Sequence, residues 1–277
     1  MAIISFSLQK GGVGKTSMAI NFSSFLAMRG LKTLVIDFDP QANVTEVLLN
    51  EPPQSAVHNI ILDKKPASDI IVESNVAGLD ILPSDIQFAS AEWALMSAMD
   101  NQYVLKDIIV RNGLDTQYDQ IVIDAPPNLS ITMLNVLCAT QFVIIPLSCA
   151  RFSLKGLRDF MNTLIQIRKR PNPDIKVLGA FLNFFDKRKS LHQAIEADIQ
   201  SLFGEGLFDS RIRQSVKIDE ASEKQLPIFL YAKNSSAAED VGQFCEEAVA
   251  RLDNLFLPDI LADYASRIKT SRQEATT

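Results

Sequence analysis

The segment QKGGVGKTS at residues 9–17 holds the residues with the most specific chemistry in this 277-residue chain. Gly14, Lys15 and Thr16 match the end of the phosphate-binding pattern GxxxxGK[ST], whereas Gln9 replaces the first glycine of that pattern. The glycines let the backbone turn so that several N–H groups converge on phosphate oxygens. Lys15 would reach the β and γ phosphates, and the Thr16 hydroxyl would bind Mg²⁺, which prefers oxygen ligands. The predicted nucleotide-binding residues of the loop are Lys10, Gly11, Gly12, Val13, Gly14, Lys15, Thr16 and Ser17.

Lys10 is the unusual residue of this loop. A lysine that precedes two glycines cannot easily fold back onto phosphates that its own loop already surrounds. It could instead project outward to a nucleotide that a second subunit holds. We therefore predict that Lys15 binds the nucleotide of its own chain and that Lys10 contacts the nucleotide of a second subunit. The presence of Lys10 thus predicts a dimer. A glycine-rich turn that binds no ligand is the alternative interpretation of the segment.

Three aspartates follow apolar segments that have the length of buried strands. Asp37 and Asp39 come after one such segment and Asp124 after another. Because ligands collect at the carboxyl ends of strands in parallel α/β sheets, these side chains are expected beside the phosphate-binding loop. Asp39 is the candidate for orienting the attacking water. Thr16, Asp39 and Asp124 are the candidates for the Mg²⁺ shell, with Asp124 acting through water. Asp37 alone could also be a helix N-cap.

The elements that must position these residues alternate between strands and helices along the chain. Apolar runs predict strands at 2–8, 31–36, 118–123 and 175–182. Helical spacing predicts a helix at 15–28, and a further helix is expected at 153–170. This order predicts an α/β fold with a doubly wound, mostly parallel sheet and helices on both faces. We expect one domain over residues 1–277, with a core to about 254 and a C-terminal helix and tail at 255–277.

Three motifs together resemble the ParA/Soj partition ATPases, a MinD-like class of P-loop NTPases with a deviant Walker A motif. They are KGGVGKT at 10–16, DFDPQAN at 37–43 and IVIDAPPNLSITMLNVL at 121–137. The similarity runs from residue 2 to about 254, and DPQAN discriminates best because MinD-type division proteins have a different sequence there. The resemblance implies a homodimer that forms on ATP binding, with two nucleotides at the interface and Lys10 acting across it. It also implies slow, Mg²⁺-dependent ATP hydrolysis.

The same resemblance implies partners and further contacts. The ATP-bound dimer would bind DNA non-specifically, and a ParB-like centromere-binding protein would stimulate hydrolysis. The dimer would associate with the nucleoid when ATP is bound, in a protein that is expected to be cytoplasmic because it has no apolar run of membrane-span length and no signal-peptide pattern. Asn183 and Pro227 are similar to the adenine contacts of the family. This chain has Cys149-Ala150-Arg151-Phe152 where many relatives have Glu-Tyr-Tyr or Glu-Phe-Phe, so no acidic role is expected there.

The distribution of charge identifies where DNA could bind. The whole chain has a net charge of −6, but residues 151–190 contain ten Lys and Arg against three Asp and Glu. Clustered cations suit phosphate binding without base-specific contacts. The triplet 168–170 is better explained as the basic end of a helix. The stretch RIRQSVKIDEAS resembles the arginine-bearing DNA-contact segment of the family, so Arg211, Arg213 and Lys217 are the predicted DNA-binding residues.

Three other functions compete with partition. The stripe Phe256, Ile260, Tyr264 and Ile268 could belong to a MinD-like helix that binds membranes, although Asp259 and Asp263 would repel anionic lipid. We favour a helix that packs on the body of the protein or on the dimer partner. A reductase of the nitrogenase iron-protein type would need paired cysteines, whereas the three cysteines are scattered and are predicted to be buried thiols. A ParA-like ATPase could also position another cargo. No apolar run reaches the roughly 18 residues of a membrane span, so no stable membrane association is expected.

Overall fold

The computed structural model of the chain describes residues 1–97, 99–149, 154–254 and 258–266. Its strands are β1 (Ala2–Phe6), β2 (Thr33–Asp37), β3 (Val72–Glu73), β4 (Leu79–Leu82), β5 (Gln120–Asp124), β6 (Phe142–Ser148), β7 (Lys176–Asn183) and β8 (Leu207–Ile212). They form one sheet in the order β3-β4-β2-β5-β1-β6-β7-β8. All neighbours are parallel except β3 and β4. The predicted, mostly parallel sheet is confirmed.

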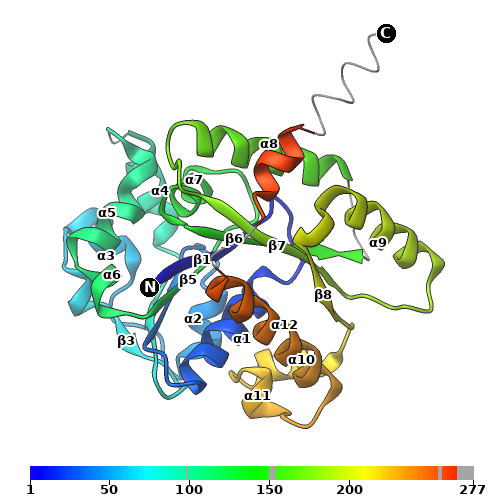
Figure 1. Cartoon of the computed structure of the whole chain (residues 1–277). Coiled ribbons are helices and arrows are strands. Elements are labelled where there is room, and N and C mark those ends of the chain that lie inside the picture. Colours follow the sequence, from blue (N-terminus) through cyan, green and yellow to red (C-terminus); the bar gives the residue numbers. More distant parts are fainter. Residues whose placement is uncertain (98, 150–153, 255–257, 267–277) are drawn as a thin grey trace.

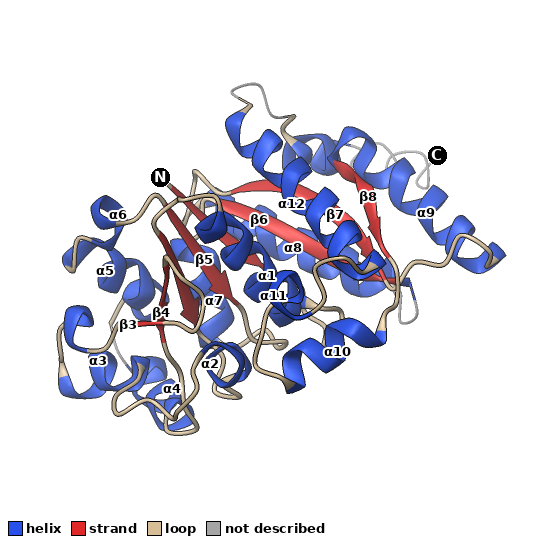
Figure 2. Cartoon of the chain, turned by 90° about the horizontal axis from the view of Figure 1, so that it is seen from below, coloured by secondary structure: helices blue, strands red, loops and turns tan. Residues whose placement is uncertain are grey.

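Helices cover both faces of this sheet (Figures 1 and 2). One face carries α1 (Lys15–Met28), α2 (Asn43–Leu48), α10 (Val216–Glu223), α11 (Ile228–Tyr231) and α12 (Ser236–Asp253). The other carries α3 (Val57–Asp63), α4 (Phe88–Ser97), α5 (Val104–Arg111), α6 (Leu114–Gln117), α7 (Ile131–Ala139), α8 (Leu154–Lys169) and α9 (Ser190–Phe203). Strands β2, β5 and β1 are parallel neighbours in the middle of the sheet, so their carboxyl ends lie side by side.

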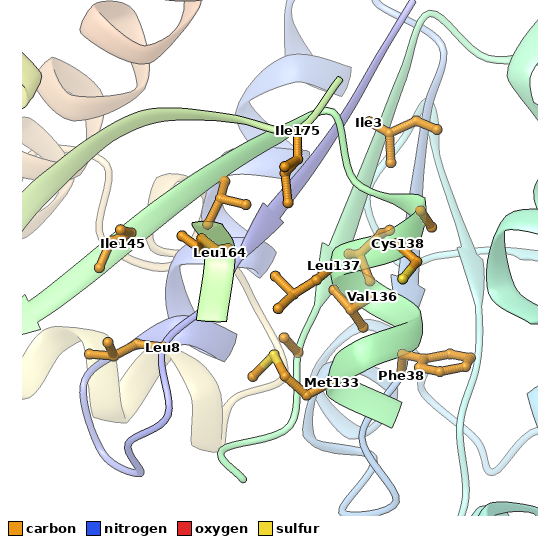
Figure 3. Close-up of a cluster of buried hydrophobic side chains, with 14 of the residues drawn as sticks. Ile3, Leu8, Phe38, Met133, Val136, Leu137, Cys138, Ile145, Leu164 and Ile175 are labelled. Carbon is orange, nitrogen blue, oxygen red and sulfur yellow. The ribbon is translucent and has the colours of Figure 1, made fainter. Parts of the chain in front are cut away.

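Each central strand contributes to two separate cores because its side chains alternate between the faces. In β1, Ile3 belongs to the core under α7 and α8, whereas Ile4 belongs to the core under α1 and α12. Figure 3 shows the first core, in which Met133 and Val136 of α7 pack with apolar side chains from the strands. Burial on both faces explains why the strands read as continuous apolar runs.

Helix α1 is buried on more than the one side that its apolar spacing suggests. Phe22 packs against Phe6 of the sheet and against Phe244 of α12, at ring-centroid distances of 5.8 and 6.4 Å. Phe25 contacts Phe229 of α11 at 5.8 Å. The sheet, α11 and α12 therefore enclose α1, which fixes the helix whose N-terminus follows the glycine-rich loop.

The C-terminal helix packs on the protein, as we favoured from its composition. Residues 260–266 are helical, and Ile260 and Tyr264 are buried in the core beside α8. Arg168 of α8 donates two hydrogen bonds to Asp259, the longer at 2.6 Å. Phe256 and Ile268 of the proposed stripe lie outside the described residues. The search of the described helices found none that is long and apolar enough to cross a membrane.

The three cysteines are buried free thiols, as predicted. Cys138, Cys149 and Cys245 form no disulfide. Burial raises the pKa of Cys138 and of Cys149 to about 11, which keeps both thiols protonated near neutral pH. The structure therefore gives no support to a cysteine-based cluster or nucleophile at these positions.

Candidate functional site

The loop between β1 and α1 ends in a glycine that no other residue can replace without strain. Gly14 is the N-cap of α1 with φ 94°, in the left-handed region that favours glycine. A Cβ atom at this position would lie 2.2 Å from Nδ2 of Asn183. No side chain caps the N-terminus of this 14-residue helix. Its backbone N–H groups and its positive dipole end are therefore available to an anion.

Lys15 is a buried cation at this helix end. Its residue is only 6% exposed, and its Nζ donates a 2.7 Å hydrogen bond to the backbone carbonyl of Lys10. Burial lowers the pKa of Lys15, while the carboxylates of Asp124 and Asp39 oppose that shift. The loop thus holds a desolvated positive charge close to its own backbone donors, which is the arrangement that phosphate binding requires. Lys10 itself is half-buried.

Thr16 and Asp124 meet across the loop. The Thr16 hydroxyl donates a 2.8 Å hydrogen bond to Oδ2 of Asp124. The other oxygen, Oδ1, is buried without a hydrogen-bond partner among the described residues. Burial raises the pKa of Asp124 well above its usual value, and the nearby Asp37 raises it further. A cation, or a water molecule bound to a cation, would give this buried oxygen a partner and would stabilise the charged form of Asp124.

These residues fit Mg²⁺ only together with a phosphate ligand. No group of three or more His, Cys, Asp or Glu residues in the described part of the chain is arranged to hold a metal. Thr16 and Asp124 would hold Mg²⁺ from the protein side, and phosphate oxygens and water would complete its shell. Bound there, Mg²⁺ would neutralise charge on the phosphates.

Asp37 has a structural role at the end of β2. Its Oδ2 accepts hydrogen bonds from the backbone N–H of Thr45 at 2.9 Å and from the Thr45 hydroxyl at 2.7 Å. Burial raises the pKa of Asp37 to about 6, and the two Thr45 hydrogen bonds oppose the shift. The N-cap residue of α2 is Ala42, whose side chain makes no capping hydrogen bond, so Asp37 is not an N-cap. Asp37 instead holds the first turn of α2 from the end of β2 through Thr45, while Asp39 remains the candidate for chemistry.

Asp39 lies in a loop that two hydroxyl groups fix. The Ser84 hydroxyl donates to the backbone carbonyl of Asp39 at 2.8 Å, and the Ser84 N–H donates to the Thr45 hydroxyl at 2.9 Å. Oδ1 of Asp39 accepts from the N–H of Gln41 at 3.0 Å. Its residue is 8% exposed, so the carboxylate is nearly enclosed. Ser84 and Thr45 thus determine where the Asp39 backbone lies.

Replacing Thr45 by valine is expected to destabilise the protein by about 1–3 kcal/mol. Valine has the same shape but no hydroxyl, so the buried carboxylate of Asp37 loses a donor and the N–H of Ser84 loses its acceptor. Thr45→Ser keeps the hydroxyl and is the matched control, with an expected loss below about 1 kcal/mol. Urea unfolding of the three proteins would measure the difference. Equal stability of Thr45→Val and the unaltered protein would contradict the network.

The two predicted adenine contacts approach different parts of the segment that contains the loop and α1. Nδ2 of Asn183 donates to the carbonyl of Val13 at 2.9 Å, so this side chain touches the loop itself. Pro227 is the N-cap of α11, and the next N–H, that of Ile228, donates to Asn21 of α1 at 2.8 Å. Asn21 in turn donates to the carbonyl of Ser17 at 2.7 Å. The assignment of an adenine contact to Asn183 and Pro227 stays a prediction.

The three predicted DNA-binding residues are all engaged within the chain. Arg211 of β8 donates to Glu196 at 2.7 Å and to the carbonyls of Phe208 and Ser210, and its side chain is 19% exposed. Arg213 pairs with Asp240 through two side-chain hydrogen bonds and is 55% exposed. Lys217 pairs with Glu220 at 2.6 Å and is half-exposed. Arg211 therefore has a structural role in this chain, and only Arg213 and Lys217 retain an exposed charge.

Sequence reasoning missed Thr45, Ser84 and Asn21. Ser84 follows β4, and a polar residue after a parallel strand is the same signal that identified Asp37 and Asp124. Thr45 and Asn21 carry no such signal, because each lies within a helix and joins a near neighbour, Asp37 or Ser17, to a residue much further along the chain, Ser84 or Ile228. The Cys149–Phe152 difference from the family lies outside the described residues apart from Cys149.

Fold and site together define the class of this protein. The chain has the parts of a P-loop nucleotide-binding protein. These are a mostly parallel sheet, a glycine-rich loop that leads into α1, a buried lysine, and aspartates at the ends of β2 and β5. A family profile described as an AAA domain matches residues 1–177.

Comparison with known proteins gives the family. The chain is 30% identical to the chromosome partitioning protein ParA of Caulobacter vibrioides (strain NA1000 / CB15N) over 253 residues, which cover 91% of this chain and 95% of that protein. It is 33% identical to the sporulation initiation inhibitor protein Soj of Bacillus subtilis (strain 168) over 250 residues, or 90% and 98% of the two chains. The chain belongs to the ParA/Soj family of partition ATPases, which confirms the resemblance found in its motifs.

A solved structure with a nucleotide has the same fold. The cobyrinic acid a,c-diamide synthase of Mycobacterium smegmatis with bound ATP analog and magnesium has a TM-score of 0.81 and 25% sequence identity, and the match covers 93% of this chain and 97% of that one. Its nucleotide and magnesium are those of a related protein. They agree with the ligands that Lys15, Thr16 and Asp124 suit in this chain.

Proposed function

We propose that this protein is a partition ATPase whose dimer forms when ATP binds, binds DNA non-specifically, and is released after slow ATP hydrolysis that a ParB-like partner stimulates. The observation that carries the proposal is the pair of lysines in one loop. Lys15 is buried at the N-terminus of α1, and its ammonium is bonded to the carbonyl of Lys10. Lys15 is therefore placed to bind the nucleotide of its own chain. Lys10 is then available to the nucleotide of a second copy.

In the proposed reaction the protein mainly positions groups and neutralises charge. Lys15 and the N–H groups of residues 11–16 bind the phosphates, and Thr16 and Asp124 hold Mg²⁺. Asp39 orients the attacking water from a loop that Ser84 fixes. Lys10 of the second copy adds positive charge where negative charge develops on the transferred phosphoryl group. Asn183 and Pro227 contact the adenine.

The test of this function is DNA binding measured with ATP, with ADP and without nucleotide, alongside a measurement of molecular mass. We expect a monomer without ATP, and with ATP a dimer that binds duplexes of unrelated sequence with similar affinity. A protein that stays monomeric with ATP, or that binds DNA equally in all three states, would contradict the proposal.

Lys10→Ala is expected to spare the fold and ATP binding but to weaken ATP-driven dimerisation. Each charge-assisted hydrogen bond is worth about 1.5–3 kcal/mol, and a symmetric dimer loses two of them, so the dimer dissociation constant is expected to rise by roughly 10²- to 10⁴-fold. Sedimentation of the ATP-bound protein over a range of concentrations would measure it, and Lys10→Arg, which keeps the charge, is the control. An unimpaired dimer in Lys10→Ala would refute the role given to this lysine.

Replacing Arg213 and Lys217 together by alanine is expected to keep ATP binding and to weaken DNA binding. Each residue must partly leave its partner, Asp240 or Glu220, to contact a phosphate, so the expected loss is below the roughly tenfold per contact that a free cation gives at 0.1 M salt. A salt titration of DNA affinity is the measurement. Unchanged affinity across that titration would remove both residues from the DNA surface.

The membrane-cycling alternative loses its main support in this chain. Ile260 and Tyr264, which would have to face lipid, are buried against the body beside α8. Sedimentation with anionic liposomes and ATP is expected to leave the protein in the supernatant.

The third alternative is a ParA-like ATPase that positions a different cellular cargo. Its ATPase cycle would be the same as that of a partition ATPase, so a pull-down with the ParB-like protein of the host would distinguish the two functions.

A further inference from the structure

Three consecutive residues after β4, Pro83, Ser84 and Asp85, connect the loop of Asp39 to the rest of the protein. Ser84 is fully buried and makes the two contacts that fix this loop. Its hydroxyl donates to the carbonyl of Asp39 at 2.8 Å, and its N–H donates to the Thr45 hydroxyl at 2.9 Å. The position of the Asp39 backbone therefore depends on what holds the two neighbours of Ser84.

Helix α3 holds both of these neighbours. The N–H of Val57, its first residue, donates to the carbonyl of Pro83 at 2.9 Å. Nδ1 of the next residue, His58, lies 2.8 Å from Oδ1 of Asp85. Two successive residues of one helix thus contact the residue before Ser84 and the residue after it.

The His58 side chain is a buried titratable group to which the proposed reaction assigns no role. It is 8% exposed, and α3 buries Ile60 and Ile61 in the same apolar core. Nδ1 makes no hydrogen bond of good geometry with the described residues, so the contact with Asp85 is the polar interaction that the structure gives this nitrogen. Burial of an imidazole without a polar partner is unfavourable. An apolar side chain could fill the same space, so the contact with Asp85 is what a histidine adds here.

Asp85 in turn begins the turn that leads into α4. Its Oδ1 accepts from the N–H of Gln87 at 3.1 Å, and its carbonyl accepts from the N–H of Phe88, the first residue of α4, at 3.0 Å. Helices α3 and α4 pack against each other in one core (Figure 2). The contact with His58 therefore joins this turn to α3, and residues 83–85 are held between the two helices.

We propose that His58 is a positioning residue for ATP hydrolysis: it holds Asp85, which fixes Ser84, and Ser84 fixes the backbone from which Asp39 orients water. The inference rests on the role proposed for Asp39 and extends it to a helix that contributes no residue to the phosphate-binding loop. ATP binding depends on that loop, so a loss of positioning should lower turnover and spare affinity for ATP.

The first experiment measures phosphate release over a range of ATP concentrations for the unaltered protein, His58→Ala and His58→Asn. His58→Ala is expected to lower kcat by roughly 10- to 100-fold, because a misplacement of about 1 Å at a reacting group has an effect of this size. KM for ATP should stay within about twofold, since ground-state binding is not altered. His58→Asn keeps a polar nitrogen near the position of Nδ1 and should recover most of the loss.

The matched control is His192→Ala, which removes the other histidine of the chain. His192 is 5% exposed against 6% for His58, and its Nδ1 accepts from the N–H of Asp186 at 3.0 Å in the loop after β7. Each histidine thus holds a segment that follows a strand, but four strands separate β7 from β4 in the sheet. His192→Ala should leave kcat within about twofold of the unaltered value.

A second variant tests the pair itself and does not depend on how well His58→Ala folds. Asp85→Asn keeps the volume of the side chain and an acceptor for the Gln87 N–H, and it removes the charge that faces His58. It is expected to lower kcat in the same direction as His58→Ala. The double variant should lose no more than the worse of the two, because residues that act through one contact are not additive. Rates are compared at a temperature at which thermal unfolding shows each variant folded.

The outcomes separate this inference from the proposed function. A kcat within about twofold of the unaltered value in both His58→Ala and Asp85→Asn would overturn the positioning role alone. An equal fall in His192→Ala, or additive losses in the double variant, would also overturn that role, because the effect would then not pass through the pair. No ATP turnover in the unaltered protein, or turnover retained in Asp39→Ala, would overturn the proposed mechanism together with this inference.

Discussion

Replacing Lys15 by alanine is expected to abolish ATP binding at physiological nucleotide concentrations. The Lys15 ammonium is the buried positive charge next to Asp39 and Asp124, and without it the phosphates would enter a site with a surplus of negative charge. Removing one partner of a buried charge pair costs about 2–5 kcal/mol or more, which corresponds to a loss of affinity of roughly 30-fold to several thousand-fold. Titration with a fluorescent ATP analogue would measure this change.

Lys15→Gln is the companion variant. Its amide can still donate to the carbonyl of Lys10, so the loop keeps its internal contact while the charge is removed. Because burial of the ammonium is itself unfavourable, neither variant is expected to unfold the protein, and thermal unfolding should confirm this. ATP affinity within a few-fold of the unaltered protein in both variants would contradict the role of Lys15.

Replacing Asp39 by alanine is expected to leave ATP binding intact and to lower the rate of hydrolysis by about 10²- to 10⁴-fold, the usual effect of removing a group that orients or activates water. The protein should then accumulate as an ATP-bound dimer. Phosphate release under saturating ATP, combined with sedimentation, would show both effects. Asp39 is well suited to this test because Ser84 holds its backbone carbonyl, so the loop keeps its path when the side chain is truncated.

Two controls make the Asp39 test specific. Asp39→Asn keeps the volume and the acceptor for the Gln41 N–H, so it isolates the effect of charge. Ser84→Ala keeps the carboxylate but frees the backbone, and it is expected to reduce turnover less than Asp39→Ala. ATP turnover retained in Asp39→Ala would remove the residue from the mechanism.

Most of the fold was accessible from the sequence because its signals are local. A strand, three glycines and a helical spacing define residues 2–28, and Asp37 and Asp124 mark the ends of strands that are now seen to pair through Val35 and Val122. Spacing alone could not reveal that α1 is enclosed by α12 and α11, because those helices lie more than 200 residues away.

The sequence predicted which residue types form the site, but it did not predict which side chains bond to one another. Asp37 and Asp39 look alike in sequence, and the contacts of Thr45, through its backbone N–H and its hydroxyl, distinguish the structural carboxylate of Asp37 from that of Asp39. Arg211 is predicted to contact DNA because the stretch RIRQSVKIDEAS resembles the DNA-contact segment of the family, and its ion pair with Glu196 of the preceding helix could not be read from that stretch. Partners that are distant in sequence decide which charges remain free, and sequence patterns carry little information on them.

The hydrogen bond between Lys15 and the carbonyl of Lys10 joins the two lysines of the loop through its backbone. An ammonium has three donors, so Lys15 can keep this bond while it donates to a phosphate oxygen. The residue proposed to act on a second copy thus also fixes the position of the charge that meets the phosphates in its own chain. A substitution that displaces the backbone at Lys10 would therefore disturb both nucleotide sites of a dimer, whereas one that changes only its side chain would disturb the site of the partner.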